Sequence, residues 1–187
     1  MHSASWDYSQ VHQFFDKNLN FTDHVSDLCK KGNQKLHALA RISNYLREGK
    51  LKIIMKTFVQ SQFNYCPLVW MFHNRTLNQK INRLHERALR IIYKNDNSTF
   101  QELLDKDGSV TIHQRNLQRL ATEMFKIKHH LSPLPMQDIF TEKIHQHDLR
   151  NKRQWENYNL RTVRYGIETI RNMGPKTWDI VPIEIKE

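Results

Sequence analysis

Apolar residues recur at helical spacing between residues 76 and 94 and predict an amphipathic helix there. They lie three or four positions apart, so they share one side of a helix with about 3.6 residues per turn. They are Leu77, Ile81, Leu84, Ala88, Ile91 and Ile92. Thr76 is a candidate N-cap, and Gln79 three residues later would complete a capping box. We expect one face of this helix to lie in a core.

The same spacing predicts four further helices in the first 131 residues, at about 23–46, 50–65, 99–105 and 111–130. Thr22 is the candidate cap of the first helix, and Gly49 suits a left-handed residue after its end. Gly32 falls on its apolar face, which predicts a close approach of another helix there. Ser98 and Gln101 form a possible capping box for the short helix, which Gly108 would close.

The helix at 50–65 should end or kink at Pro67, because proline lacks an amide donor. Its expected buried face is Leu51, Ile54, Met55, Phe58, Val59 and Tyr65. We expect residues 68–72 to continue as a helix buried on all sides, and an aromatic platform for stacking bases is the alternative. The fold class is therefore all-α, an irregular bundle of about four to five helices followed by short elements. The expected core includes Leu36, Leu39, Ile54, Phe58, Trp70, Ile81, Leu84, Ala88, Leu117, Leu120 and Met124.

The character of the chain changes at the Ser-Pro-Leu-Pro run of residues 132–135. Residues 141–164 are polar and show little periodicity, so we expect a loose arm or an ordered irregular segment without a core of its own, with short strands flanking Tyr158 and Tyr165. Pro175 is expected at the first position of a short helix in which Trp178 packs inward. The predicted divisions are residues 1–21, 22–131 and 132–187.

The net positive charge of the chain indicates what kind of partner it binds. Lys and Arg number 29 against 19 Asp and Glu, which gives a net charge of +10 at pH 7. Such a chain is attracted to polyanions, so nucleic acid is the expected partner, and an ordinary basic surface is the alternative. Two isolated cysteines, no apolar run of about 18 residues and no signal-peptide pattern favour an intracellular protein that does not bind membranes.

Basic residues of the helix at 76–94 form a stripe of their own, about a third of a turn from the apolar one. The stripe consists of Lys80, Arg83, Arg87, Arg90 and Lys94. It would extend about 21 Å along the helix, and each arginine can bind a phosphate through two N–H groups. Glu86 lies within reach of this stripe, so part of it could be paired at the surface instead. Arg115, Arg119 and Lys126 are expected on the outer side of the next helix.

Candidate catalytic and metal sites are weak. His85-Glu86 resembles the start of a zinc-protease motif, but Leu89 stands where the second histidine would be. Asp105 to Gly108 is only a fragment of a calcium loop. The histidines at 129, 130, 145 and 147 are expected at the surface. We therefore predict no catalytic residue, no metal ligand, no cofactor and no small-molecule substrate for this chain.

Five phrases resemble the region after the polymerase palm in reverse transcriptases of non-LTR, LINE-type (jockey-like) retrotransposons. They are QKLHALARIS, SQFNYCPLVWMFH, LNQKINRLHERALRIIY, SVTIHQRNLQRLATEMFK and MGPKTWDIVP, and the resemblance covers residues 15–186. It implies a thumb-like grip on the template-primer duplex of an RNA-directed DNA polymerase. The family's catalysis uses Mg and a Tyr-x-Asp-Asp turn, and this chain has no Asp-Asp pair. The family's Leu-Gly-Val run before Asp16–Phe21 is missing too, which suggests a truncated copy.

Three functions stay open from the sequence. The leading hypothesis is a fragment, non-catalytic alone, that binds an RNA–DNA hybrid, RNA or DNA through its backbone without sequence specificity, using the stripe together with Arg115 and Arg119. The second is an inactive or domesticated remnant that acts as a helical protein-interaction module. The third is a polymerase subunit completed by a palm on another polypeptide.

Overall fold

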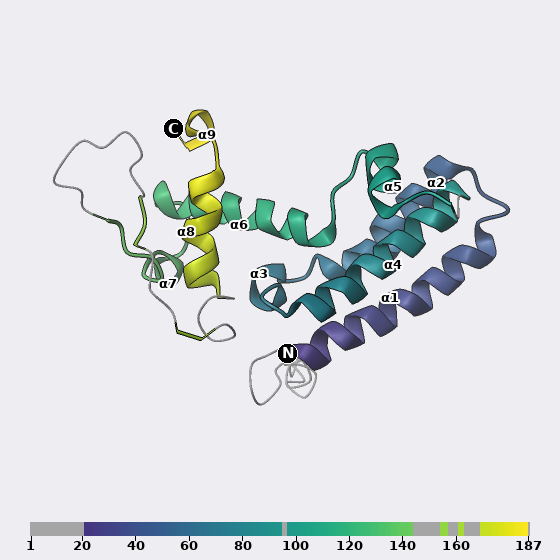
Figure 1. Ribbon diagram of the computed structural model, residues 1–187, viewed down its shortest axis with the longest axis horizontal. Coiled ribbons are helices and arrows are strands. Elements are labelled where there is room, and N and C mark those ends of the chain that lie inside the picture. Colours follow the sequence, from purple (N-terminus) through teal and green to yellow (C-terminus); the bar gives the residue numbers. More distant parts are fainter. Residues whose placement is uncertain (1–20, 95–96, 144–153, 157–160, 163–168, 187) are drawn as a thin grey trace, which may run out of the picture. The chain divides into compact units, whose positions relative to one another are not determined.

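The computed structural model describes residues 21–94, 97–143, 154–156, 161–162 and 169–186. The chain divides into two compact units, Met1–His113 and Gln114–Glu187, whereas we expected divisions after residues 21 and 131. Helices supply the regular structure, and the described ranges contain no strand (Figure 1). The predicted all-α fold is confirmed. Residues 1–20 and the positions proposed for strands beside Tyr158 and Tyr165 lie outside the described residues.

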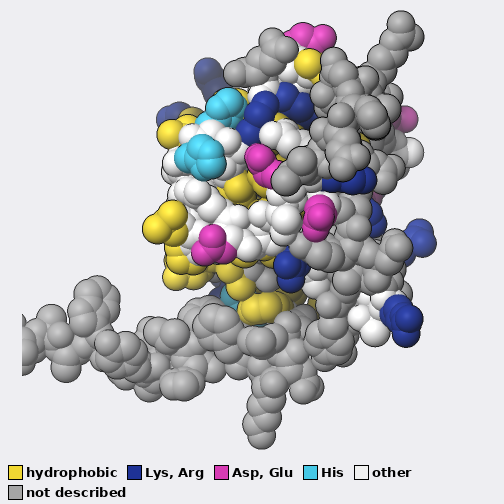
Figure 2. Space-filling view, turned by 90° about the vertical axis from the view of Figure 1, so that its left-hand side faces the viewer, with side chains coloured by type: hydrophobic (Ala, Val, Ile, Leu, Met, Phe, Trp, Pro, Cys, Tyr) yellow, Lys and Arg dark blue, Asp and Glu magenta, His cyan; other side chains and the backbone are white. Residues whose placement is uncertain are grey.

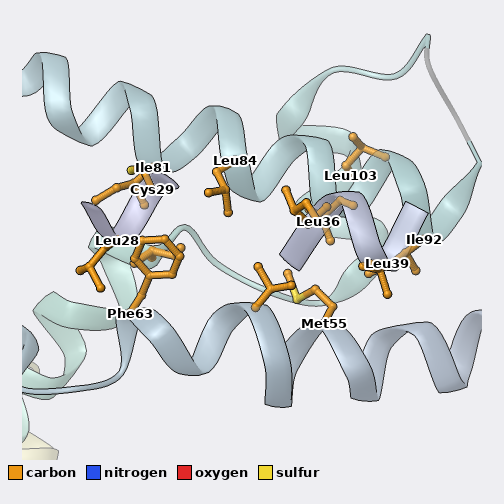
Figure 3. Close-up of a cluster of buried hydrophobic side chains, with 14 of the residues drawn as sticks. Leu28, Cys29, Leu36, Leu39, Met55, Phe63, Ile81, Leu84, Ile92 and Leu103 are labelled. Atoms are coloured by element: carbon orange, nitrogen blue, oxygen red, sulfur yellow. The ribbon is translucent and has the colours of Figure 1, made fainter. Parts of the chain in front are cut away.

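Unit 1 is built on two long helices that run in the same direction, α1 (Thr22–Ile42) and α4 (Arg75–Tyr93) (Figure 1). Between them the chain returns through a helical segment made of α2 (Glu48–Ile54), η2 (Met55–Val59) and η3 (Gln60–Phe63). Two short helices, α3 (Pro67–Trp70) and α5 (Phe100–Asp107), precede and follow α4. Apolar side chains from these segments meet in one core (Figure 3).

Most of the expected core is buried. Leu36, Leu39, Trp70, Ile81, Leu84, Ala88, Leu120 and Met124 are each at most 4% exposed. Gly32 lies where a close approach was predicted, because a Cβ atom built there would come within 2.6 Å of Leu84 Cδ1. Ile54 and Leu117 are only partly buried. Phe58 and Tyr65, both placed on the buried face from the sequence, are 47% and 72% exposed.

A π-helical turn explains why Phe58 was misplaced. The buried apolar residues of this segment are Leu51, Met55, Val59 and Phe63, each four positions after the last. In a regular α-helix, three such steps would drift about 120° around the axis. The wider i→i+5 turn of η2 rotates less per residue and so offsets the drift at Val59, and the tighter turn of η3 leads on to the buried Phe63. Phe58 is thereby turned outward, where the Lys35 ammonium lies 4.6 Å from its ring centroid.

The helix caps differ from the predicted ones by one or two residues. Phe21, at a φ of 53°, precedes α1, so Thr22 lies inside the helix rather than capping it. Asn74 caps α4, and its Oδ1 accepts a hydrogen bond from the Leu77 amide at 3.0 Å. Thr99 caps α5 through a capping box with Glu102. Both asparagine and threonine are good caps, so sequence spacing alone does not choose between near neighbours.

Two loop predictions have different outcomes. Gly49 does not end α1, because that helix stops at Ile42 and Gly49 lies within α2. Pro67 starts α3 as its first residue, so the expected interruption of the preceding helix is confirmed. The stretch after Pro67 is not buried on all sides. Trp70 and Met71 are 2% exposed, but Val69 is 48% exposed, since α3 is a single turn at the surface.

Unit 2 contains most of α6 (Ile112–Lys128) and the short helices α7 (Leu134–Gln137), α8 (Ile170–Ile180) and α9 (Ile183–Lys186). It has a core of its own, made of Met124, Ile127, Phe140, Trp155 and Trp178. The burial of Trp155 in this core contradicts the expectation that residues 141–164 have no core. Trp155 is 3% exposed and pairs with Glu142 in an isolated antiparallel bridge.

Helix α8 begins earlier than predicted, so Gly174 and Pro175 lie inside it rather than before it. A Cβ atom at Gly174 would come within 2.7 Å of Phe140 and 2.8 Å of the Met124 sulfur. Glycine therefore lets the helix pack closely on this core. Trp178 is 1% exposed, as expected, and its Nε1–H donates to Gln154 at 2.9 Å. The burial of Trp178 helps to offset the helical hydrogen bond that is lost because Pro175 has no amide N–H.

Candidate nucleic-acid interface

Helix α4 carries a buried face and a cationic face on opposite sides. Three residues widen the buried face beyond the predicted stripe, namely His85, Leu89 and Tyr93. With these included, the cations lie about 150° around the axis from the buried face, further than the third of a turn expected from the sequence. The cationic side is thus directed away from the core of unit 1.

Four of the five stripe residues are exposed. Lys80, Arg83 and Arg87 lie within α4, and Lys94 is its C-terminal cap in a left-handed conformation with a φ of 49°. Among the described residues, no carboxylate forms an ion pair with Lys80, Arg83 or Arg87. Their charges are therefore available to a ligand in solvent.

Arg90 differs from its neighbours in the stripe. Its Nη2 donates to Glu86 Oε1 at 2.7 Å, and both side chains are about three-quarters buried or slightly less. This i,i+4 pair realises the surface pairing that was one of the two possibilities from the sequence. Arg90 would have to exchange Glu86 for a phosphate, so we rank it below Arg83 and Arg87 as a contact.

The two arginines proposed on α6 are less accessible than predicted. Arg115 is half-buried, and its Nε and Nη2 atoms are shielded from solvent without a hydrogen-bond acceptor among the described residues. Burial lowers the pKa of Arg115, and the nearby charge of Arg119 lowers it further. Arg119 is half-buried as well. Lys126 is exposed but paired with Glu123 at 3.3 Å.

Exposed cations on α1 were not singled out from the sequence. Lys30 and Arg41 lie on one outer stripe with Gln34 and His37, at spacings of three and four residues. That spacing was available in the sequence, but it was hidden by the stronger apolar signal of the same helix. Lys80 of α4 lies close enough to α1 for its charge to oppose the raised pKa that burial gives the Cys29 thiol.

One face of the molecule shows described basic side chains mixed with side chains of other types. On the face drawn in Figure 2, the described Lys and Arg side chains alternate with carboxylates, histidines and hydrophobic groups. That face carries no continuous basic patch among its described side chains.

Among the residues weighed as metal ligands, His85 and Asp107 serve the fold, whereas His145 and His147 lie outside the described residues. His85 is 1% exposed, and its ring lies edge-to-face with Phe100 at 5.6 Å. Asp107 accepts a hydrogen bond from the Tyr93 hydroxyl at 2.9 Å and lies 3.5 Å from the Lys52 ammonium. The described part of the chain contains no group of three or more potential metal ligands. Nor does any helix within it have the length and apolar character needed to cross a bilayer.

Comparison with protein families, curated proteins and solved structures finds no significant match to this chain.

Proposed function

We propose that this protein binds the backbone of a nucleic acid, without sequence preference, through the exposed cations of α4. The ligand would be an RNA–DNA hybrid, RNA or DNA, and the chain would act as the thumb-like part of a retrotransposon reverse transcriptase inside the cell. It would contribute no catalytic residue, and any Mg-dependent chemistry would belong to a palm supplied by another polypeptide.

One observation carries the proposal. Lys80, Arg83 and Arg87 are exposed on a single side of a helix whose other side is anchored in the core. With Lys94 they extend along about 21 Å, which spans several phosphates of a duplex strand. The guanidinium group of arginine binds phosphate oxygens through two N–H groups and makes no contact with a base. The array therefore contributes affinity rather than sequence specificity.

The salt dependence of binding follows from the number of phosphates that are neutralised. Four contacts would give a slope of roughly −3 to −4 in a plot of log K against log salt concentration. Removing three of the four cations should bring that slope close to −1 if they carry the binding.

The test is fluorescence anisotropy with a labelled RNA–DNA hybrid duplex between 50 and 200 mM salt. The main variant is Lys80→Gln/Arg83→Gln/Arg87→Gln. The control, Arg47→Gln/Lys50→Gln/Lys56→Gln, removes the same charge from exposed positions elsewhere in unit 1. We expect weaker binding and a shallower slope for the main variant alone. Identical curves for both variants would overturn the proposal, because only net charge would then matter.

A helical protein-interaction module is the second candidate. Tyr45, Ile53 and Phe58 of unit 1 are 87%, 63% and 47% exposed, and apolar side chains at a surface can serve a protein partner. This candidate predicts weak nucleic-acid binding that stays unaltered when the α4 cations are neutralised.

A further inference from the structure

A half-open hollow of about 190 Å³ lies between the first half of α1 and the residues around η3. His24, Leu28 and Lys31 line it from α1, and Ser61, Gln62 and Tyr65 line it from the other side. All six belong to unit 1. None of them contributes to the cationic array of α4, so the function proposed above does not use this hollow.

The lining combines an exposed aromatic ring with a fixed backbone. The Tyr65 side chain is 72% exposed, although the sequence placed it in the core. Its carbonyl oxygen accepts a hydrogen bond from Trp70 Nε1 at 2.8 Å, and Trp70 itself is buried. The residue is thus anchored while its ring is accessible at the rim. An anchored, exposed aromatic ring is a suitable stacking surface for a flat ligand.

The polar groups of the hollow suit the edges of such a ligand. The Gln62 amide offers both a donor and an acceptor, and the Ser61 hydroxyl can do either. Leu28, which is 7% exposed, supplies an apolar surface. Burial lowers the pKa of His24, which favours the neutral imidazole, a form that can both donate and accept a hydrogen bond.

A cation at the edge of the hollow extends this chemistry to an anion. The Lys31 ammonium lies 2.7 Å from Asp27, but both side chains are about half exposed. An ion pair of this kind is weak, so Lys31 can move to a phosphate at small cost. A flat ring with hydrogen-bonding edges and an attached phosphate is a nucleotide.

We propose that this hollow takes one unpaired base of the nucleic acid bound by α4, with the base stacked on Tyr65 and its edge against Gln62. This inference rests on the proposed function. Unpaired bases are recognised in this way because their faces and edges are free of a duplex partner. A duplex along α4 that continues into a single strand would supply such a base.

The route from the cationic array to the hollow is short. The array starts at Lys80, which lies near Cys29 on one flank of α1, and the neighbouring Leu28 lines the hollow on the other flank. Helix α1, about 10 Å in diameter, stands between them, so a strand that crosses its surface would need at least roughly three nucleotides. The exposed Lys30 lies on the outer surface of α1 between the two flanks.

The experiment compares a blunt RNA–DNA hybrid duplex with the same duplex carrying a four-nucleotide single-stranded extension at the 5′ or the 3′ end. The full chain should bind one of the extended duplexes about 5- to 100-fold more tightly than the blunt one, the range that stacking of one base provides. 2-Aminopurine placed third or fourth in the extension should lose fluorescence on binding, because its ring would stack on Tyr65.

Two variants separate stacking from other effects. Tyr65→Ala should lose the preference for the extension and the quenching, while its affinity for the blunt duplex stays unchanged. Tyr65→Phe keeps the ring and should keep both. Equal affinity of the intact chain for blunt and extended duplexes would overturn this inference and leave the proposed function standing. Absence of binding to every duplex would overturn both.

Discussion

The contact of Gly32 with Leu84 offers a sharp test of how α1 and α4 pack in unit 1. A methyl group at Gly32 would lie 2.6 Å from Leu84 Cδ1 and 3.6 Å from Phe63 Cε2. Leu84 is only 4% exposed and Phe63 only 1%, so neither side chain can move into solvent. We therefore predict that Gly32→Ala strains this core.

Two opposing effects set the magnitude. Replacing glycine by alanine inside a helix stabilises it by about 1 kcal/mol. Forcing a methyl group into a filled core costs about 1–3 kcal/mol. Gly32→Ala should therefore lower the free energy of unfolding by roughly 0–2 kcal/mol. With Leu84→Ala present, the atoms that would clash are absent, and Gly32→Ala should instead raise the free energy of unfolding by about 1 kcal/mol or more.

Urea unfolding followed by circular dichroism would measure this double-mutant cycle. We expect a coupling free energy of about 1–3 kcal/mol between the two sites. Gly49→Ala is the control, because a Cβ atom there meets nothing within 4 Å and its effect should add to that of Leu84→Ala. Additive effects of Gly32→Ala and Leu84→Ala would refute the close approach of the two helices.

Two further predictions concern caps and histidines. Asn74→Ala should lower the free energy of unfolding by about 1 kcal/mol, and Thr76→Ala by much less, because Asn74 makes the capping bond; equal shifts in thermal unfolding would contradict this. Burial lowers the pKa of His24, His73 and His113 below 6.5, so the unfolded chain binds more protons between the folded and unfolded pKa values. Stability should therefore fall as the pH drops through 6.5 and level off below the folded pKa values. The urea midpoint of the His73→Gln variant should change less between pH 7.5 and pH 5.5 than the midpoint of the unmodified chain. An equal change in the two proteins would show that His73 is not a buried neutral ring.

The helices of unit 1 could be predicted because their apolar spacing is regular. In α4 the residues from Leu77 to Ile92 fall on one face, so helix, face and outward cations followed from the sequence. The cap did not, because Asn74 and Thr76 both have side chains that can cap a helix, and only the extended backbone at Asn74 decides between them. The pairing of Arg90 with Glu86 was foreseen only as one of two possibilities.

Predictions failed where tertiary contacts override local pattern. Trp155 lies in a polar stretch without periodicity, and only its contacts with residues distant in sequence bury it. Pro175 was expected at a helix start, but the packing of Gly174 and Trp178 extends α8 through it. Tyr65 was assigned to the core from its spacing, because a single sequence does not reveal that the helix ends at Phe63. The hollow beside Tyr65 was missed for the same reason.

The π turn at Met55–Val59 bears on how this segment tolerates changes in length. A π turn is geometrically an α-helix that has taken in one extra residue. Deleting one residue there would change the spacing of Leu51, Met55, Val59 and Phe63 from four, four and four to four, three and four. That is the ordinary repeat of an α-helix, so the same four side chains would keep their common face. A one-residue deletion elsewhere in the segment would rotate everything after it by about 100°. The π turn is thus a point of this segment where a one-residue deletion is nearly neutral to the core.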